Sequence, residues 1–108
     1  MVAVDQGLDN MTIIYDDNRS HERGLQIPNP ADRLEAFGCD VSRINGHDID
    51  QIKKALQTQS DKVKAIVANT QKGYGCKLLS ENHYEWHHRS PDEKQLEEMI
   101  KELDEKTV

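Results

Sequence analysis

The sequence is poor in cysteine, in aromatic side chains and in long apolar runs, and each shortage excludes a class of protein. Cys39 and Cys76 are the only two cysteines. Two are too few for a disulfide framework, so we expect reduced thiols in a cytoplasmic protein. No apolar run approaches the roughly 18 residues of a membrane-spanning helix, and no signal-peptide pattern is present. We therefore expect no membrane association.

Basic residues are also in the minority. The chain carries 14 Lys and Arg residues against 20 Asp and Glu residues, which gives a formal net charge of -6. Binding to nucleic acid or to an anionic membrane surface requires a basic patch, so this charge argues against both partners. The length of 108 residues predicts a single domain over residues 1–108.

Three short segments rich in β-branched residues predict buried strands. They are Met11 to Tyr15, Cys39 to Ile44, and Val63 to Ala68. Three helices are predicted between and after these strands by start signals. The signals are Asn29-Pro30 with Gly38 as the stop, Asp48 with Gln51 in a capping box, and Ser90 as the N-cap before Pro91 with Glu93 three residues on.

The alternation of strands and helices predicts an α/β fold, a small three-layer parallel sheet of about three strands with right-handed crossover helices. Three parallel strands alone leave open sheet edges, which proteins normally cover. We therefore expect the sheet to be completed by another polypeptide or by a second copy of the chain.

Oxygen-bearing side chains end the first predicted strand, in the segment Asp16-Asp17-Asn18. The carboxyl ends of strands in an open α/β sheet are where ligands bind, and Mg²⁺ prefers such oxygen ligands. A strand-to-turn junction explains the same residues without any metal, and taken alone it is the better explanation.

Two loops follow the other predicted strands. In Asn45-Gly46-His47-Asp48 we favour a turn plus N-cap in which Gly46 takes an awkward backbone angle. Gly73-Tyr74-Gly75 follows Lys72, and two such glycines allow backbone amides to approach a phosphate. This motif is weak, and a plain loop is the more frequent explanation.

The densest histidine cluster contains His83, His87 and His88 around Trp86. His83 and His87 have a spacing that would suit zinc on a helix, but the predicted helix starts only at Ser90. A histidine that contacts phosphate or carries a proton is the better interpretation.

Taken together, five collinear stretches resemble the transketolase family, and in particular the N-terminal section of split transketolases. They are LDNMTIIYDDNR (8–19), EAFGCDV (35–41), INGHDIDQIKKAL (44–56), ANTQKGYG (68–75) and EWHHRSP (85–91). The resemblance implies the C-terminal half of a pyrophosphate-binding domain, a partial thiamine-diphosphate-binding fold.

The resemblance also implies roles for individual residues. Asn18 would be a metal ligand, and the backbone carbonyl of Ser20 would be another. Lys72, with Gly73 and Gly75, would lie near the diphosphate. His88 would contact the cofactor and assist catalysis, with its neighbour His87 as the alternative. The implied cofactors are thiamine diphosphate and Mg²⁺.

Parts of the family pattern are absent from the chain. The Gly-Asp-Gly segment that supplies the metal with an aspartate is missing, as is the pyrimidine domain. We therefore expect a transketolase-like fragment or subunit, inactive alone. With completing chains or as a homo-oligomer, it would help transfer a two-carbon ketol unit between sugar phosphates. The alternatives are a non-catalytic remnant or assembly module and, less favoured, the related deoxyxylulose-phosphate synthase branch.

Overall fold

A computed structural model describes residues 1–19, 27–82 and 84–106 of the chain. The chain divides into two compact units, Met1–Thr70 and Gln71–Val108, and each is described by itself. The single domain over residues 1–108 stays a prediction. Within the described ranges, no helix is long and apolar enough to cross a membrane.

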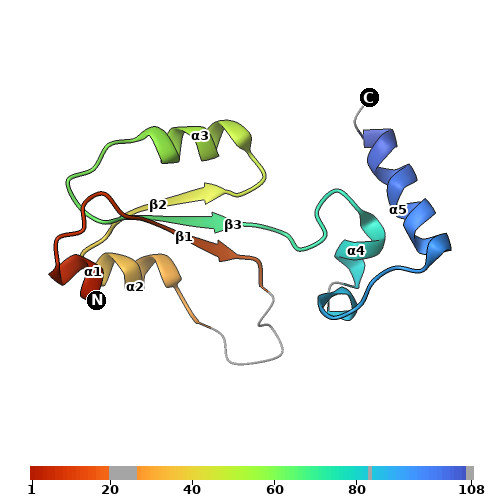
Figure 1. Cartoon of the computed structure of the whole chain (residues 1–108), viewed down its shortest axis with the longest axis horizontal. Helices are drawn as coiled ribbons and strands as arrows, with labels where there is room; N and C mark the ends of the chain where they lie inside the picture. The colour runs from red at the N-terminus through yellow and green to blue at the C-terminus, as the bar shows by residue number, and fades with distance from the viewer. Residues whose placement is uncertain (20–26, 83, 107–108) are drawn as a thin grey trace. The chain divides into compact units, whose positions relative to one another are not determined.

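The first unit is built on a sheet of three parallel strands in the order β1-β3-β2. Strand β1 is Thr12–Asp17, β2 is Asp40–Asn45 and β3 is Lys64–Asn69. Helices α2 (Pro30–Ala36) and α3 (Ile49–Gln57) lie on opposite faces of this sheet (Figure 1). The chain passes from β1 to the far edge and then returns to the middle, so two crossovers of one hand place their helices on opposite faces. The predicted three-layer α/β fold is confirmed.

Strand β3 is the centre of the hydrophobic core. Its residues Ala65 to Ala68 are all buried, and Cys39, Val63 and Ala65 form a cluster against which α1 (Val2–Asp5) also packs. The prediction that the first strand is buried is wrong, because β1 is an edge strand. Its residues alternate between exposed and half-buried, and the Ile14 side chain is 62% exposed.

The predicted strands are found with ends that differ by one or two residues. β1 continues through Asp16 and Asp17, because the Asp17 carbonyl still accepts a hydrogen bond from Thr70 N at 3.2 Å. These two aspartates therefore belong to the strand and do not follow it. β2 and β3 each begin and end one residue later than predicted.

The first two predicted helix starts are correct in position. Asn29 precedes α2 but has a left-handed conformation (φ 50°) and makes no side-chain capping hydrogen bond, while Gly38 (φ 99°) follows the helix end. The Asp48 carboxylate accepts hydrogen bonds from Asp50 N at 3.0 Å and Gln51 N at 3.2 Å. The Gln51 amide donates back to Asp48 Oδ2 at 3.0 Å, which completes a reciprocal cap.

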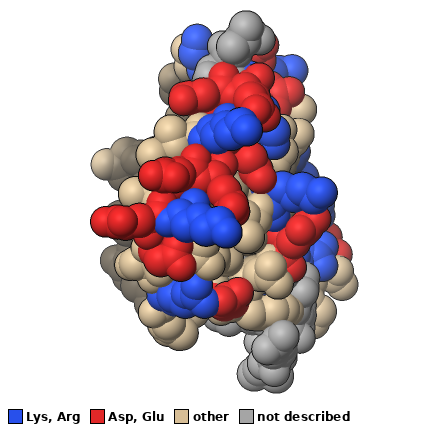
Figure 2. Space-filling model, turned by 90° about the vertical axis from the view of Figure 1, so that its right-hand side faces the viewer, with Lys and Arg blue, Asp and Glu red and all other residues tan. Residues whose placement is uncertain are grey.

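The second unit contains α4 (Lys77–Glu81), the 3₁₀ helix η1 (Glu85–His87) and α5 (Glu93–Lys106), of which only α5 is predicted. The prediction that Ser90 caps α5 is wrong. Asp92 Oδ1 accepts from Gln95 N at 2.8 Å, and Asp92 N donates to Gln95 Oε1 at 3.0 Å. Acidic and basic side chains are interspersed on the surface seen in Figure 2.

Candidate functional site

Polar side chains form a row at the carboxyl edge of the sheet. Asp17 pairs in register with Asn69 on the central strand, and Asn69 pairs with Asn45 on the other side. Each strand therefore contributes one oxygen-bearing side chain at the same level. Sequence reasoning found Asp17 but gave Asn69 no role. The available signal was that Asn69 and Thr70 follow the third predicted strand as Asp16 and Asp17 follow the first.

A second set of contacts fixes the end of β1 on the same edge. Asp16 Oδ1 accepts a hydrogen bond from the Thr70 hydroxyl at 2.5 Å, and Asp16 Oδ2 accepts one from the Asn18 amide at 3.2 Å. Asp17 forms an ion pair with Arg19 at 3.7 Å. The half-buried Asn18 is thus held by its amide nitrogen, which turns its acceptor oxygen away from Asp16.

Gly46 lies against the end of β3 in the turn that follows β2. Its N–H donates to the Asn69 carbonyl at 2.8 Å, and a Cβ there would lie 2.4 Å from Thr70 Cγ2. Its φ is not positive, so the expected awkward backbone angle is wrong. The turn needs glycine because two chain segments approach closely. The predicted turn plus N-cap is otherwise confirmed, with His47 N donating to Asn45 Oδ1 at 3.0 Å.

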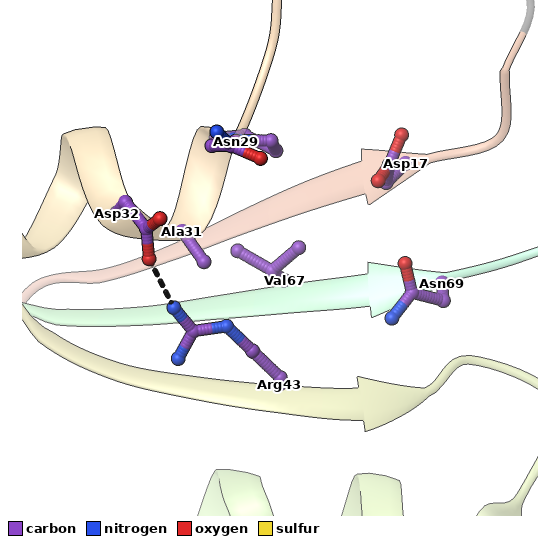
Figure 3. Close-up of a pocket in the computed structure, with 8 residues that line it drawn as sticks. Asp17, Asn29, Ala31, Asp32, Arg43, Val67 and Asn69 are labelled. Atoms are coloured by element: carbon purple, nitrogen blue, oxygen red, sulfur yellow. Dashed lines mark hydrogen bonds and ion pairs between the residues drawn. The ribbon is translucent and has the colours of Figure 1, made fainter.

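A cavity of about 180 Å³ lies between the carboxyl half of the sheet and the start of α2 (Figure 3). It is lined by Asp17, Asn29, Pro30, Ala31, Asp32, Arg43, Val67 and Asn69. Arg43 forms an ion pair with Asp32 at 2.6 Å and another with Glu35 at 3.8 Å. Its charge is therefore already balanced, so the cavity offers a mixed polar wall and no strong anion site.

In the second unit, the loop after Thr70 contains two glycines with positive φ, Gly73 at 79° and Gly75 at 90°. A Cβ on Gly73 would lie 2.6 Å from the backbone of Leu79 and Ser80, whereas one on Gly75 would meet only Leu103, at 3.7 Å. Gly73 is therefore needed both for its positive φ and for the close approach of the backbone, whereas Gly75 is needed for its positive φ alone. Within this loop the Tyr74 and Cys76 amides already donate to the Gln71 and Gly73 carbonyls, each at 3.0 Å.

Lys72 and the histidine segment meet within this unit. Lys72 Nζ lies 2.5 Å from His87 Nδ1, and the His88 ring lies edge-on to the His87 ring with centroids 4.4 Å apart. A lysine ammonium can only donate, so His87 Nδ1 is the acceptor in this contact. The contact joins Lys72 to His87, the residue given as the alternative to His88.

Trp86 and Arg89 organise the rest of that segment. The Arg89 guanidinium lies over the Trp86 ring at 4.8 Å from its centroid, pairs with Glu85 and donates to Gln95 Oε1 at 3.0 Å. Trp86 Nε1 is buried and has no hydrogen-bond partner among the described residues. A buried donor of this kind carries a desolvation cost unless a further group accepts from it.

Only one of the two predicted metal ligands, Asn18, lies among the described residues. Ser20, whose carbonyl is a predicted metal ligand, and His83 both lie outside the described residues. Among those that are described, no group of three or more His, Cys, Asp and Glu side chains could hold a metal ion. Asn18 belongs to the first unit, whereas Lys72, Gly73, Gly75 and His88 belong to the second.

Neither cysteine has the environment of a nucleophile. Cys39 and Cys76 are both buried and free. Burial raises the pKa of the Cys39 thiol, an effect that the nearby amino terminus partly opposes. A buried thiol whose pKa is raised in this way reacts slowly as a nucleophile.

Comparison with known proteins tests the resemblance noted in the sequence. One subunit of the apulose-4-phosphate transketolase of Actinobacillus succinogenes is 33% identical over 110 residues, which cover 95% of this chain and 40% of the relative. The corresponding subunit from Phocaeicola vulgatus is 31% identical over 92% of the chain, and mouse transketolase is 31% identical over 89%.

The chain is a relative of the transketolases. It spans about 40% of the length of the two apulose-4-phosphate transketolase subunits and 16% of mouse transketolase. No family model matches the sequence. Two of these relatives are each named as one subunit of an enzyme, and the chain is similar to them over most of its own length.

Proposed function

We propose that this transketolase relative contributes one wall of a site for thiamine diphosphate and Mg²⁺. The site would serve the transfer of a two-carbon ketol unit between sugar phosphates. The observation that carries the proposal is the polar row Asp17, Asn69 and Asn45 at the carboxyl edge of the sheet, in a relative of transketolases. When bound, thiamine diphosphate supplies the electron sink for the chemistry.

The residues of the chain fit parts of this cofactor. Asn18 has a side-chain oxygen that suits a hard cation, and the Ser20 carbonyl would be the second ligand from this chain. Lys72 would supply positive charge beside a loop in which Gly73 and Gly75 have positive φ angles. His88, or His87 beside Lys72, would hold a proton near the reacting atoms.

The same residues do not form a whole site. With no cluster of three candidate acidic, histidine or cysteine ligands in the described residues, the metal would need at least one more side chain. We propose that completing transketolase-like chains carry that ligand and the pyrimidine domain. Alone, the chain would bind the cofactor too weakly for calorimetric detection and would transfer no ketol unit.

Calorimetric titration with thiamine diphosphate and Mg²⁺ tests this proposal. The chain is measured alone and with the transketolase-like product of a neighbouring gene, and heat of binding is expected only for the mixture. Asn18→Ala and Lys72→Ala should each weaken binding at least about tenfold, because each substitution removes one charged or metal-mediated contact. The exposed Asn10→Ala and Lys53→Ala are matched controls that should bind as the wild type does.

The open sheet edge of β1 favours a second candidate function, a non-catalytic assembly module that keeps the fold. No binding of cofactor under any condition, with a stable assembly, would favour that module. Equal binding by Asn18→Ala and by Asn10→Ala would refute the role of Asn18.

A further inference from the structure

The two adjacent histidines of the second unit lie on a segment that has little stability of its own. His87 ends η1, a 3₁₀ helix of three residues, and His88 follows it. Both residues are exposed. The hydrogen bonds of a 3₁₀ helix have poorer geometry than those of an α-helix, and the bond from His87 N to the Tyr84 carbonyl is 3.3 Å long. Side-chain contacts therefore have to fix where the two histidines lie.

The Arg89 side chain supplies three such contacts at once. Its guanidinium lies over the Trp86 ring, 4.8 Å from the centroid, and it pairs with the Glu85 carboxylate. Arg89 Nη2 also donates to Gln95 Oε1 at 3.0 Å. Trp86 and Glu85 belong to η1, whereas Gln95 belongs to α5. One side chain therefore fastens the histidine segment to the long helix of the same unit.

The α5 end of this connection is itself held in place. Gln95 Oε1 accepts from Asp92 N at 3.0 Å as well as from Arg89, and Gln95 N donates to Asp92 Oδ1 at 2.8 Å. These reciprocal bonds form the cap that begins α5. The helix continues for 14 residues and buries Met99, so it gives Arg89 a firm support.

Arginine is the side chain that suits this set of contacts. A guanidinium is planar, so its face can lie on an indole ring while the donors at its edge reach two oxygens. A lysine ammonium carries the same charge but has neither a flat face nor a fork of donors. The Arg89 and Glu85 side chains are each 43% exposed, and an isolated exposed ion pair contributes little. The three contacts together restrict Arg89 more than the ion pair alone would.

We propose that Arg89 is a positioning residue for His87 and His88. It holds η1 against the start of α5, while the contact of 2.5 Å between Lys72 Nζ and His87 Nδ1 holds the ring of the first histidine. This inference rests on the proposed function, in which one of the two histidines holds a proton near the reacting atoms. Proton transfer requires hydrogen-bond reach between donor and acceptor, so the position of the histidine decides its efficiency.

Direct contact between Arg89 and an anionic cofactor is the competing role. Arginine is a frequent phosphate ligand. Here, however, Glu85 balances the charge of Arg89, and Trp86 and Gln95 occupy a face and a donor of its guanidinium. An anion would compete with Glu85 for the same charge. The two roles also differ in what they require, because a positioning residue acts only through the histidines and a direct ligand acts without them.

The single tryptophan allows the positioning to be measured in the full chain without cofactor. Trp86 is the only tryptophan, so one indole N–H signal in the NMR spectrum reports on this segment. Its Nε1 is buried and has no hydrogen-bond partner among the described residues. In Arg89→Lys and Arg89→Gln, exchange of this N–H with solvent should rise at least about tenfold, the equivalent of one lost charge-assisted hydrogen bond.

Further variants separate this connection from a general loss of structure. Glu85→Gln weakens one of the three contacts and should raise the exchange rate less than Arg89→Gln does. Arg33 is an exposed arginine of the first unit that donates to the Pro28 carbonyl at 2.9 Å, so it provides matched controls. Arg33→Lys and Arg33→Gln should leave the exchange of the indole N–H unchanged.

The affinity for thiamine diphosphate with Mg²⁺ tests the link to the histidines. Under the conditions in which the wild type binds the cofactor, Arg89→Lys should weaken binding about tenfold, because a displaced histidine loses its contact with the cofactor. In a background that carries both His87→Ala and His88→Ala, Arg89→Lys should change the affinity less than about twofold. No histidine then remains for Arg89 to position.

The remaining outcomes decide against the proposal or against the function on which it rests. Equal losses of affinity from Arg89→Lys with and without the two histidines would assign Arg89 to direct contact with the cofactor. Unchanged exchange of the indole N–H in both Arg89 variants would refute the positioning role. If the exchange rises as expected but the wild type binds no thiamine diphosphate under any condition, the proposed function fails, while the fixing of the histidine segment by Arg89 stands.

Discussion

Gly46 is the position at which the carboxyl edge of the sheet should tolerate least change. An alanine Cβ there would lie 2.4 Å from Thr70 Cγ2, 3.1 Å from the Asn69 carbonyl oxygen and 3.3 Å from Ala68 Cβ. The shortest of these is about 1 Å inside ordinary van der Waals contact. Thr70 would have to move, although its hydroxyl is bonded to Asp16 at 2.5 Å.

The size of the effect follows from two opposing contributions. Overpacking a well-ordered position costs about 1–3 kcal/mol. Because the φ of Gly46 is not positive, alanine regains about 0.4–1 kcal/mol by restricting the unfolded chain. We expect Gly46→Ala to lower the free energy of unfolding by about 1–2 kcal/mol, a Tm decrease on the order of 5–15 °C for a unit of this size.

A double-mutant cycle with Thr70→Ser isolates the cause. Serine lacks Cγ2 but keeps the hydroxyl for Asp16, so it removes the shortest contact alone. Thermal and urea unfolding of the wild type, both single variants and the double variant should give a favourable coupling of about 1 kcal/mol. A Gly46→Ala protein as stable as the wild type, or no rescue by Thr70→Ser, would refute the close-approach explanation.

Three further predictions concern stability, each measured by the free energy of unfolding. Gly75→Ala should cost about 1–2 kcal/mol, because alanine is strained at positive φ. Gly73→Ala should cost at least about 1 kcal/mol more, because its Cβ also meets backbone; equal costs would contradict the geometry. Asp92→Ala should cost about 1 kcal/mol and Ser90→Ala less than about 0.5 kcal/mol, and the reverse order would restore Ser90 as the cap. The raised pKa of Cys39 favours the protonated thiol in the folded state, so its contribution is intact below about pH 8.5 and is lost as pH rises above that value. Cys39→Ala should therefore have a shallower decline of stability at alkaline pH, and an unchanged decline would contradict this assignment.

The strands and the parallel α/β fold could be predicted because β-branched runs and capping residues are local signals. Asp48 with Gln51 is such a signal, and the structure uses it as predicted. The start of α5 is different, because two capping patterns overlap, Ser90 with Glu93 and Asp92 with Gln95. The structure selects the second, in which the Gln95 oxygen also accepts from Arg89. Both patterns satisfy the capping rule, so the sequence alone does not rank them.

Burial of β1 could not be predicted, because it depends on strand order. A parallel sheet of three strands has one central strand, and local sequence does not say which one it is. The crossover from β1 to the far edge leaves β3 in the middle, so Ile66 is buried and its register partner Ile14 is exposed. The same long-range pairing places Asn69 beside Asp17, which is why its position in the polar row was missed.

The candidate site could be predicted as residue types but not as contacts. Lys72 and His87 are 15 positions apart, and their 2.5 Å contact follows from the turn at Gly73 and the short helix η1. A lysine ammonium can only donate, so His87 Nδ1 is the acceptor in this contact. Under the proposed function, Lys72 would lie near the diphosphate, and its contact with His87 makes His87 as strong a candidate as His88.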